Sequence, residues 1–289
     1  MTEQSRVAVV TGASGYLGSL ICQALESRGW RVIRFTGSQA EAPGQVVRYE
    51  LAEPVTAVAR EALQAADVLI HAAYNLTLTS AADIWRVNVE GTRRLLAAAR
   101  EAGTGRLIVL SSMSAFAGTT QLYGRAKLDI EAITVESGGC AIRPGLVYGK
   151  QAGGMAGALR KLTALPAVPV IAGSAGVYTV AAEDLMDAIV RLAAAESLTP
   201  EVISVAHPER VTFSALLSAI ASQEDRRCRF VPVPWRLVYW PLRAAEFLHL
   251  RLPFRADSLL GLVYAAPGLL GAEQLASLGV TLRPFSPRA

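Results

Sequence analysis

Short apolar runs alternate with longer segments of helical spacing along the first half of the chain. The runs predict strands at Val7 to Val10, Val32 to Phe35, Val46 to Leu51, Asp67 to Ala72, Arg106 to Ser111 and Cys140 to Arg143. Apolar residues three and four apart predict helices at Leu17 to Leu25, Pro54 to Ala65, Ala82 to Ala102 and Tyr123 to Glu136. Because the strands are continuous Val, Ile and Leu, they indicate an α/β fold with a doubly wound parallel Rossmann sheet that is buried on both faces.

The pattern changes after Gly149, where Gly and Pro become frequent. A helix is predicted at Ala182 to Ala195 and a strand at Val202 to Val205, and the chain after Pro232 is helical and aromatic. We therefore expect a Rossmann domain in residues 1–150, with a return segment at about 172–206. Residues 151–171 and 207–289 would form a smaller C-terminal substrate lobe over the carboxyl ends of the strands.

Composition removes several classes of function. The net charge of +4 comes from scattered arginines without a basic block, so we expect no nucleic-acid partner. Cys22, Cys140 and Cys228 lack metal-ligand spacing, which favours reduced thiols and no metal site. The polar start does not resemble a signal peptide, and no apolar run approaches the roughly 18 to 20 residues that span a bilayer. These features favour a cytoplasmic protein without a membrane partner.

One C-terminal helix, Pro234 to Leu250, leaves two interpretations open. Arg236, Arg243 and Glu246 fall on one stripe, and apolar or aromatic side chains cover the rest. Packing in the core, in a lid or between subunits is the favoured interpretation. A peripheral membrane surface or an apolar substrate tunnel is the alternative.

A glycine-rich loop follows the first predicted strand and opens the first predicted helix. Residues 11–18 read T-G-A-S-G-Y-L-G, where Gly12 and Gly15 permit a tight turn close to a pyrophosphate and Gly18 lets the helix pack on the sheet. The helix N-terminus favours the anion. We therefore predict a dinucleotide site whose contacts in this loop are Gly12, Ser14, Gly15, Tyr16, Leu17 and Gly18.

The tip of the second predicted strand favours NADP over NAD. It contains Arg34, Thr36 and Ser38 but no carboxylate to grip the ribose hydroxyls. Hydroxyls and an arginine suit a 2′-phosphate, so these three residues are predicted cofactor contacts. NAD is the alternative, in which case Arg34 only points into solvent.

Tyr123 and Lys127 form a candidate proton-transfer pair. They lie one helical turn apart on the same face of a predicted helix. A phenol is a poor acid or base near neutral pH, and a fixed ammonium beside it favours the phenolate. Ser111 ends the fifth predicted strand, and Ser112 and Ser114 follow it. One of these serines can bind a substrate carbonyl, or they merely cap the strand.

These features together resemble the extended short-chain dehydrogenases/reductases, the NAD-dependent epimerase/dehydratase group. The match covers about the first 150 residues in order, and its motifs are the glycine loop, His71-Ala72-Ala73, Asn88 to Thr92, the serine strand, Tyr123 with Lys127, and Arg143 to Gly149.

The resemblance implies a role for each of these positions. Tyr123 would be the general acid/base, Lys127 would hold the nicotinamide ribose, and Ser112 would orient the carbonyl. Glu50 and Leu51 resemble the family's adenine contacts, and Asn88 resembles its structural or proton-relay asparagine. The remaining implied cofactor-binding positions are His71, Ala72, Ala73, Arg143 and Pro144. A homodimer is the implied assembly.

Two departures from the family pattern bear on the substrate. Met113 and Ser114 replace the Asp-Glu pair of sugar-nucleotide dehydratases, so dehydration is disfavoured. Val177 stands seven residues before Asp184, where many sugar-nucleotide epimerases carry a phosphate-binding arginine. A sugar-nucleotide substrate therefore becomes less certain.

The sequence thus predicts an NAD(P)-dependent oxidoreductase that transfers hydride to or from a carbonyl or secondary alcohol of a small molecule, with keto reduction as the leading direction. A sugar-nucleotide ketoreductase or epimerase is the first hypothesis, and a reductase of a steroid-like or other apolar ketone is the second. A non-catalytic cofactor-sensing or assembly protein is the third, and the intact Ser112, Tyr123 and Lys127 argue against it.

Overall fold

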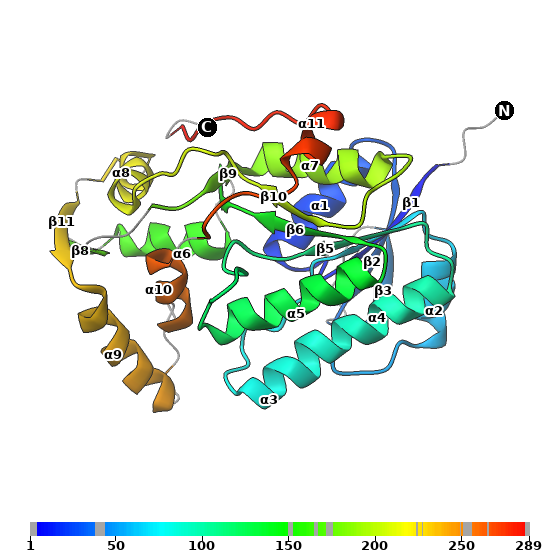
Figure 1. Ribbon diagram of the computed structural model, residues 1–289, viewed down its shortest axis with the longest axis horizontal. Coiled ribbons are helices and arrows are strands. Elements are labelled where there is room, and N and C mark those ends of the chain that lie inside the picture. Colours follow the sequence, from blue (N-terminus) through cyan, green and yellow to red (C-terminus); the bar gives the residue numbers. More distant parts are fainter. Residues whose placement is uncertain are drawn as a thin grey trace.

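A sheet of seven parallel strands forms the centre of the computed structural model (Figure 1), in the order β10-β6-β5-β4-β1-β2-β3. The strands are β1 (Val7–Thr11), β2 (Arg31–Thr36), β3 (Gln45–Arg48), β4 (Val68–His71), β5 (Arg106–Leu110), β6 (Cys140–Pro144) and β10 (Val202–Val205). The structure describes residues 5–37, 44–149, 153–164, 167–171, 176–223, 225–226, 228–248, 250, 256–264 and 266–286. The strand order reverses between β1 and β4, and open α/β sheets bind ligands at such a point, outside the carboxyl ends of the strands.

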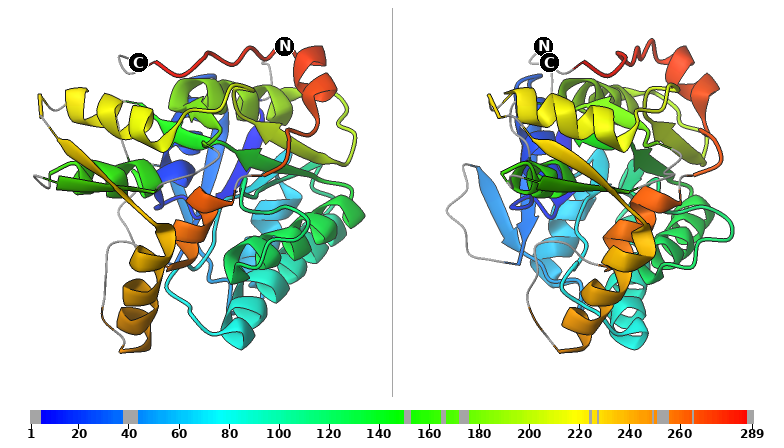
Figure 2. Two further views of the ribbon diagram at one scale, coloured as in Figure 1. Left: turned by 60° about the vertical axis from the view of Figure 1, so that its left-hand side comes forward. Right: turned by 90° about the vertical axis from the view of Figure 1, so that its left-hand side faces the viewer.

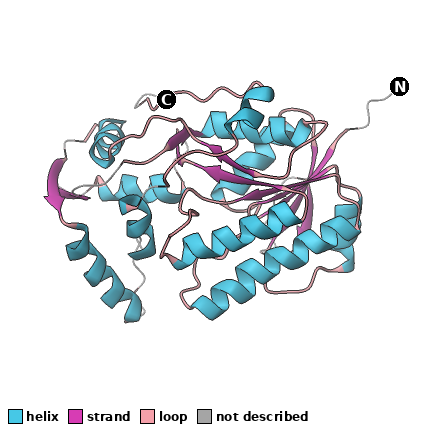
Figure 3. Cartoon of the chain, in the orientation of Figure 1, coloured by secondary structure: helices cyan, strands magenta, loops and turns pink. Residues whose placement is uncertain are grey.

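Helices cover both faces of this sheet, as Figure 3 shows. α1 (Tyr16–Glu26) and α7 (Ala182–Ala194) share an apolar core with one face. α2 (Ala57–Gln64), α4 (Glu90–Glu101) and α5 (Leu122–Glu136) share a second core with the other face. Successive side chains of β1 enter alternate cores, because strand side chains point to opposite faces in turn. The fold class is therefore the doubly wound Rossmann sheet that the apolar pattern predicts.

The expected helix from Ala82 to Ala102 contains an irregularity. It consists of α3 (Ala81–Ile84), a π-helical segment η1 (Trp85–Val89) and α4, which follow one another directly. Such π segments are frequent at functional sites. This one carries Asn88, whose side chain is fully buried.

A smaller lobe stands beyond the carboxyl ends of the central strands (Figures 1 and 2). It contains α6 (Gly154–Leu162), α8 (Phe213–Gln223), α9 (Trp235–Phe247), α10 (Ala256–Val263) and the parallel pair β8 (Ala167–Ile171) and β11 (Arg229–Val233). β7 (Leu146–Tyr148) and β9 (Thr179–Ala181) form a second parallel pair, and β7 directly follows β6 of the central sheet in the sequence. The lobe has an apolar cluster of its own, which includes Leu159, Phe213, Leu216, Leu217 and Leu259.

The last part of the chain packs against the main sheet. The sequence pattern had instead predicted that all of residues 207–289 belong to the smaller lobe. α11 (Ala272–Ser277) contacts β10, and its Leu275 is buried in the core shared with α1 and α7. Arg283 donates to the Asp184 carboxylate from its backbone N and its Nε, both at 2.8 Å. A six-residue helix carries too little periodicity to show this, because only its long-range packing decides its place.

The described residues include no helix long and apolar enough to cross a membrane.

Candidate active site

The three predicted catalytic residues meet where β5 ends and α5 begins. Ser112 lies just after β5, and Tyr123 is the second residue of α5. The Tyr123 phenol and the Ser112 hydroxyl share a hydrogen bond. Burial raises the pKa of Tyr123, and this hydrogen bond opposes the rise. The phenol therefore lies beside the hydroxyl that would hold a carbonyl oxygen, where it can donate its proton.

Lys127 lies one turn further along the same face of α5. Its side chain is buried, and its Nζ donates to the Leu110 carbonyl oxygen at 2.6 Å. Burial lowers the pKa of the Lys127 ammonium to about 7, and the negative charge of Glu131 opposes this fall. A lysine held in this way can orient a ligand hydroxyl and stabilise a phenolate nearby.

Tyr74 is a neighbour of this pair that the sequence did not reveal. Its ring meets the Tyr123 ring edge to face, with centroids 5.1 Å apart, and Lys127 Nζ lies 4.6 Å from the Tyr74 ring centroid. Tyr74 follows β4, so its contact with α5 crosses about fifty residues of chain. No local pattern could have indicated it.

The glycine loop has the shape that a pyrophosphate requires. A Cβ on Gly12 would lie 2.8 Å from the Ala73 backbone, and one on Gly18 would lie 2.1 Å from the Gly12 carbonyl oxygen. Gly12 also has a φ of +65°, which side-chain-bearing residues rarely adopt. The loop leads into the N-terminus of α1, an eleven-residue helix that no side chain caps. These residues fit a dinucleotide whose phosphates face the free N–H groups of that helix.

The other loop residues flank this turn. Ser14 is exposed, Tyr16 and Leu17 are half-buried, and Ala72 and Ala73 are half-buried after β4. The Ala73 N–H donates to Thr11 Oγ1 at 3.2 Å, which ties the two strand ends together.

His71 lies behind the dinucleotide loop and is itself buried. Thr92 Oγ1 donates to the Asn88 carbonyl oxygen at 2.7 Å, so it accepts from His71 Nε2 at 2.9 Å. Thr11 Oγ1 then donates to His71 Nδ1 at 2.6 Å. Burial lowers the pKa of His71 to about 3, and the charge of Lys127 contributes to this. Both ring nitrogens are therefore used within the protein, so His71 supports the loop, whereas the family resemblance implied a cofactor contact.

Asn88 braces the chain that follows β4. Its Oδ1 accepts from the Asn75 N–H at 2.7 Å, and its Nδ2 donates to the Asn75 carbonyl oxygen at 3.3 Å. Because Asn75 follows Tyr74, these bonds hold in place the segment that carries the tyrosine ring. Of the two roles that the resemblance implied for Asn88, the structure displays the structural one.

Arg34 does not lie where the NADP prediction expected it. It is buried, and its Nη2 donates to both carboxylate oxygens of Glu26 on α1, at 2.7 and 2.8 Å. Its guanidinium points neither to solvent nor beyond the tip of β2. A buried guanidinium requires a carboxylate partner, and Glu26 provides one. Thr36 ends β2, and Ser38 lies outside the described residues.

Glu50 and Leu51 also differ from each other in their surroundings. Glu50 is half-buried, with a side chain that is 41% exposed and pairs with Arg48 at 2.8 Å. Arg48 is the strand partner of Thr36. Leu51 is buried in the core beneath α4, and its carbonyl oxygen accepts from Arg94 at 2.8 Å. Only Glu50 offers a side chain to a ligand.

Arg143 was expected near the cofactor, but the structure places it in a buried ion pair. Its Nε and Nη2 donate to the Glu131 carboxylate at 2.7 and 2.6 Å, and Ser111 Oγ donates to the same carboxylate. Pro144, the next residue, is half-buried at the end of β6. Glu131 is a residue that the sequence reasoning missed, although it lies eight positions after Tyr123 on the same helical face.

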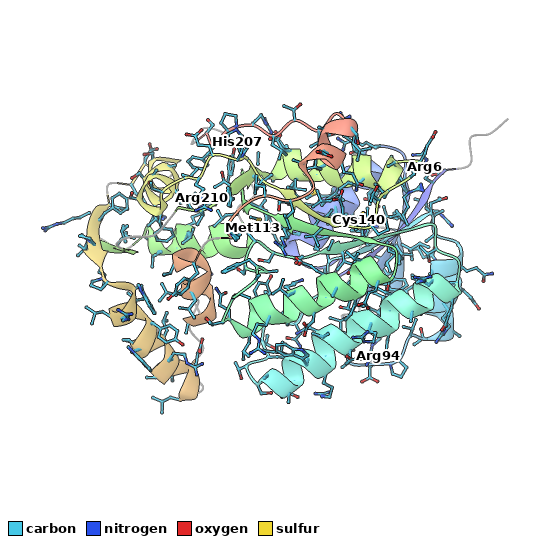
Figure 4. All side chains as sticks on the ribbon, in the orientation of Figure 1. Arg6, Arg94, Met113, Cys140, His207 and Arg210 are labelled. Atoms are coloured by element: carbon cyan, nitrogen blue, oxygen red, sulfur yellow. The ribbon has the colours of Figure 1, made fainter. Side chains whose placement is uncertain are left out.

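Gln121 is a third residue that the sequence did not reveal, after Tyr74 and Glu131. It directly precedes α5, is 2% exposed, and its Nε2 has no hydrogen-bond partner among the described residues. Figure 4 places Met113, the neighbour of Ser112, on the side of the sheet that faces the smaller lobe. A substrate carbonyl at Ser112 would therefore enter from that side.

A serine, tyrosine and lysine beside a dinucleotide loop define a nicotinamide-dependent enzyme that moves a hydride and a proton together. The model of the NAD dependent epimerase/dehydratase family matches residues 8–206, and the chain belongs to that family. It is an NAD(P)-dependent oxidoreductase or epimerase of the extended short-chain dehydrogenase type.

The individual proteins that resemble this chain share only part of its sequence. A ceramide reductase of Caulobacter vibrioides is 26% identical over 241 residues, which cover 81% of this chain and 75% of the relative. A 4-hydroxy-2-methyl-3-oxo-4-farnesyl-3,4-dihydroquinoline-1-oxide ketoreductase of Stigmatella aurantiaca is 38% identical over 118 residues, 37% of this chain and 34% of the relative. Among solved structures, MoeE5 in complex with UDP-glucuronic acid and NAD has a TM-score of 0.72 at 18% identity, covering 97% of this chain and 95% of that one. At that identity the likeness shows the fold.

Proposed function

We propose that this protein reduces a ketone on an apolar substrate, with NADPH as the hydride source. The observation that carries the proposal is the place of Val177. Its side chain is buried in the apolar cluster of the smaller lobe, together with Leu159, Phe213 and Leu217. Its backbone pairs with that of Val211 through bonds of 2.8 and 2.9 Å. An apolar side chain offers no charge to the phosphates of a sugar nucleotide, whereas its surroundings suit an alkyl chain.

The arginine next to Val211, the backbone partner of Val177, is already engaged. Arg210 lies with its guanidinium 4.7 Å from the Tyr178 ring centroid and donates to the Ala266 carbonyl oxygen at 2.7 Å. In Figure 4 it lies on the side of the smaller lobe. Through these contacts Arg210 joins the residue before β9 to the segment after α10.

The names of the similar proteins also favour an apolar ketone over a sugar nucleotide as the substrate. The ceramide reductase and the farnesyl-dihydroquinoline ketoreductase are both named as reductases, and the substrates in their names are a lipid and a compound with a farnesyl group. The UDP-sugar complex is more distant in sequence and supports the fold.

The residues of the site divide the reaction between them. When bound, the nicotinamide supplies the hydride that forms the new C–H bond at the carbonyl carbon. Ser112 donates a hydrogen bond to the carbonyl oxygen, and Tyr123 transfers its proton to that oxygen as the alcohol forms. The Lys127 ammonium stabilises the phenolate that remains.

Substrate class and catalytic role can be tested together. We expect NADPH oxidation with long-chain 3-oxo compounds and none with UDP-sugars. Tyr123→Phe should lower kcat by about 10²- to 10⁴-fold, because the proton donor is lost. Tyr264→Phe removes only the hydroxyl of a tyrosine that is 46% exposed in the smaller lobe, so it should leave kcat unchanged. Turnover of a UDP-sugar, or full activity in Tyr123→Phe, would contradict the proposal.

The choice of NADP now rests on different residues from those first expected. Thr36 ends β2, and Arg48, whose side chain is 70% exposed, lies beside it on β3. Arg48 pairs with the Glu50 carboxylate at 2.8 Å, so a 2′-phosphate beside the buried Thr36 would replace Glu50 as the partner of this guanidinium.

Cofactor preference is measured as the dissociation constants of NADPH and NADH. Arg48→Gln should weaken NADPH binding about tenfold or more, the loss expected for one charge-assisted hydrogen bond, and should leave NADH within about twofold. Arg60→Gln is a matched control, since Arg60 is an exposed arginine paired with Glu101 on the α2–α4 side. An equal effect of Arg48→Gln on both cofactors would overturn the assignment.

We also propose a cytoplasmic homodimer. Cys22 and Cys140 are buried free thiols, which suits a reducing compartment. The dimer follows from the family resemblance alone, and light scattering in solution measures it.

A further inference from the structure

Exposed apolar side chains gather around α9. Of the large apolar side chains that are well exposed in the described part of the chain, most lie between residues 231 and 264. They are Val231, Leu237, Trp240, Leu248, Leu250 and Tyr264. Leu237 and Trp240 are each 67% exposed, so this helix does not bury its apolar residues as a core helix would.

α9 is apolar on two opposite faces. Its inner face packs into the cluster of the smaller lobe through Trp235, Val238, Tyr239 and Leu242. At 100° per residue, Leu237, Trp240, Ala244 and Leu248 fall on the opposite face, and all four are exposed. The inner face alone is enough to hold the helix in the fold, so the outer face requires another explanation.

The charges on α9 indicate what covers the outer face. Arg236 and Arg243 are exposed and lie along one flank of the apolar stripe. Glu246 is the only acidic residue in this helix. It lies on the side of α10, where its Oε1 accepts from the Ala256 N–H at 2.9 Å, and its Oε2 pairs with Arg243 at 3.4 Å. The outer face therefore combines tryptophan, leucine and arginine without a carboxylate.

The sequence around α9 also has a net positive charge. Residues 224–257 contain seven arginines and four acidic residues, in a chain whose net charge is +4. Most of the excess positive charge is thus concentrated in the segment that also exposes the apolar side chains. A basic, apolar helix face of this composition matches an anionic lipid surface, where leucine and tryptophan enter the interfacial layer and arginine binds headgroup phosphates.

The position of α9 allows such a contact. In Figures 1 and 2 it projects from the edge of the molecule, beside α10 and away from the central sheet. We infer that α9 docks this protein on the surface of a membrane that contains anionic lipids, through Leu237, Trp240 and Leu248, with Arg236 and Arg243 at the headgroups. This inference adopts the alternative that the sequence left open for Pro234 to Leu250, a peripheral membrane surface, and it revises our expectation that the protein has no membrane partner. It stands independently of the proposed reduction.

Flotation of the full-length protein with lipid vesicles tests the inference. We expect binding to vesicles of phosphatidylcholine with phosphatidylglycerol, weaker binding to phosphatidylcholine alone, and a decrease with salt. The double variant Leu237→Ser/Trp240→Ser should reduce partitioning about tenfold or more, because it removes two apolar side chains from the interfacial layer. Arg236→Gln/Arg243→Gln should abolish the preference for the anionic vesicles.

Leu76→Ser is the matched control, since Leu76 is 61% exposed outside the smaller lobe. It should bind vesicles as the wild type does. Turnover of a water-soluble ketone should be unchanged in every α9 variant, which separates a failure of docking from a failure of the proposed function.

Two outcomes would overturn the inference. One is flotation of Leu237→Ser/Trp240→Ser equal to that of the wild type. The other is absence of vesicle binding by the wild type, combined with a change from dimer to monomer in that variant, because the outer face of α9 would then join two copies of the chain.

Discussion

At the scale of single residues, the hydrogen-bond and ion-pair partners of a buried side chain decide its protonation state and its role. His71 accepts from one threonine and donates to another, so the neutral ring satisfies both neighbours. Protonation of Nδ1 would place a second donor against Thr11, whose oxygen already accepts from the Ala73 N–H. The same logic governs Arg34 and Arg143, which each pair with a carboxylate inside the fold.

His71 gives a prediction about pH. The unfolded chain binds a proton at this histidine near pH 6.5, whereas the folded protein resists it down to about pH 3. Unfolding therefore takes up a proton between these values, and the free energy of unfolding falls as the pH is lowered through the window. The stabilising contribution is fully present above about pH 6.5.

Urea unfolding of the wild type and of His71→Gln, at several pH values from about 6.5 to 4, measures this effect. The wild type should lose on the order of 1 kcal/mol per pH unit more than the variant, because glutamine does not titrate. The carboxylates titrate in both proteins, so the comparison cancels them. Parallel stability profiles would show that His71 is not held neutral.

At the scale of elements, α5 is the part of the fold that organises the chemistry. Tyr123, Lys127 and Glu131 follow one another at intervals of four residues, so they share one helical face. Glu131 reaches across to Arg143 on β6 and to Ser111 at the end of β5. This carboxylate thus joins the helix of the acid/base to the strand that leads into Ser112, and its charge supports the ammonium of Lys127.

Glu131 is therefore a positioning residue, and Glu131→Gln tests it. The variant leaves Arg143 buried without a negative partner, which should cost about 3 to 5 kcal/mol of stability. It also removes the charge that opposes the lowered pKa of Lys127, so the limb of the pH–kcat profile that follows Lys127 should shift to lower pH.

The double variant Glu131→Gln/Arg143→Gln separates these effects. Removing both charges should restore part of the stability, because no unpaired charge remains buried. The pH–kcat profile should stay displaced, since Lys127 still lacks its carboxylate. If the double variant recovered the wild-type profile, the link between Glu131 and Lys127 would be wrong.

At the scale of the whole molecule, the site lies between parts that are far apart in the chain. The dinucleotide loop follows β1, the acid/base begins α5, and the apolar cluster around Val177 draws on α6, α8 and α10. The parallel order of the sheet brings the first two together, because all carboxyl ends of parallel strands meet at one edge. If the protein reduces an apolar ketone, as proposed, the smaller lobe supplies the apolar environment for the substrate at that edge.

The sequence by itself determined the local features of this protein. Apolar periodicity indicated the strands and helices, the glycines of residues 12–18 indicated a phosphate turn, and the spacing of Tyr123 and Lys127 indicated a shared helical face. These features could be predicted because their period or turn geometry is set within a few residues.

Only the tertiary structure decided which polar side chains remain for a ligand. In the folded protein Arg34 pairs with Glu26, Arg143 pairs with Glu131, and His71 is hydrogen-bonded to two threonines. Tyr74 packs against Tyr123, and one apolar face of α9 is exposed to solvent. Each of these outcomes depends on contacts between distant segments. Burial and charge pairing belong to the packed molecule, so no pattern within one segment can specify them.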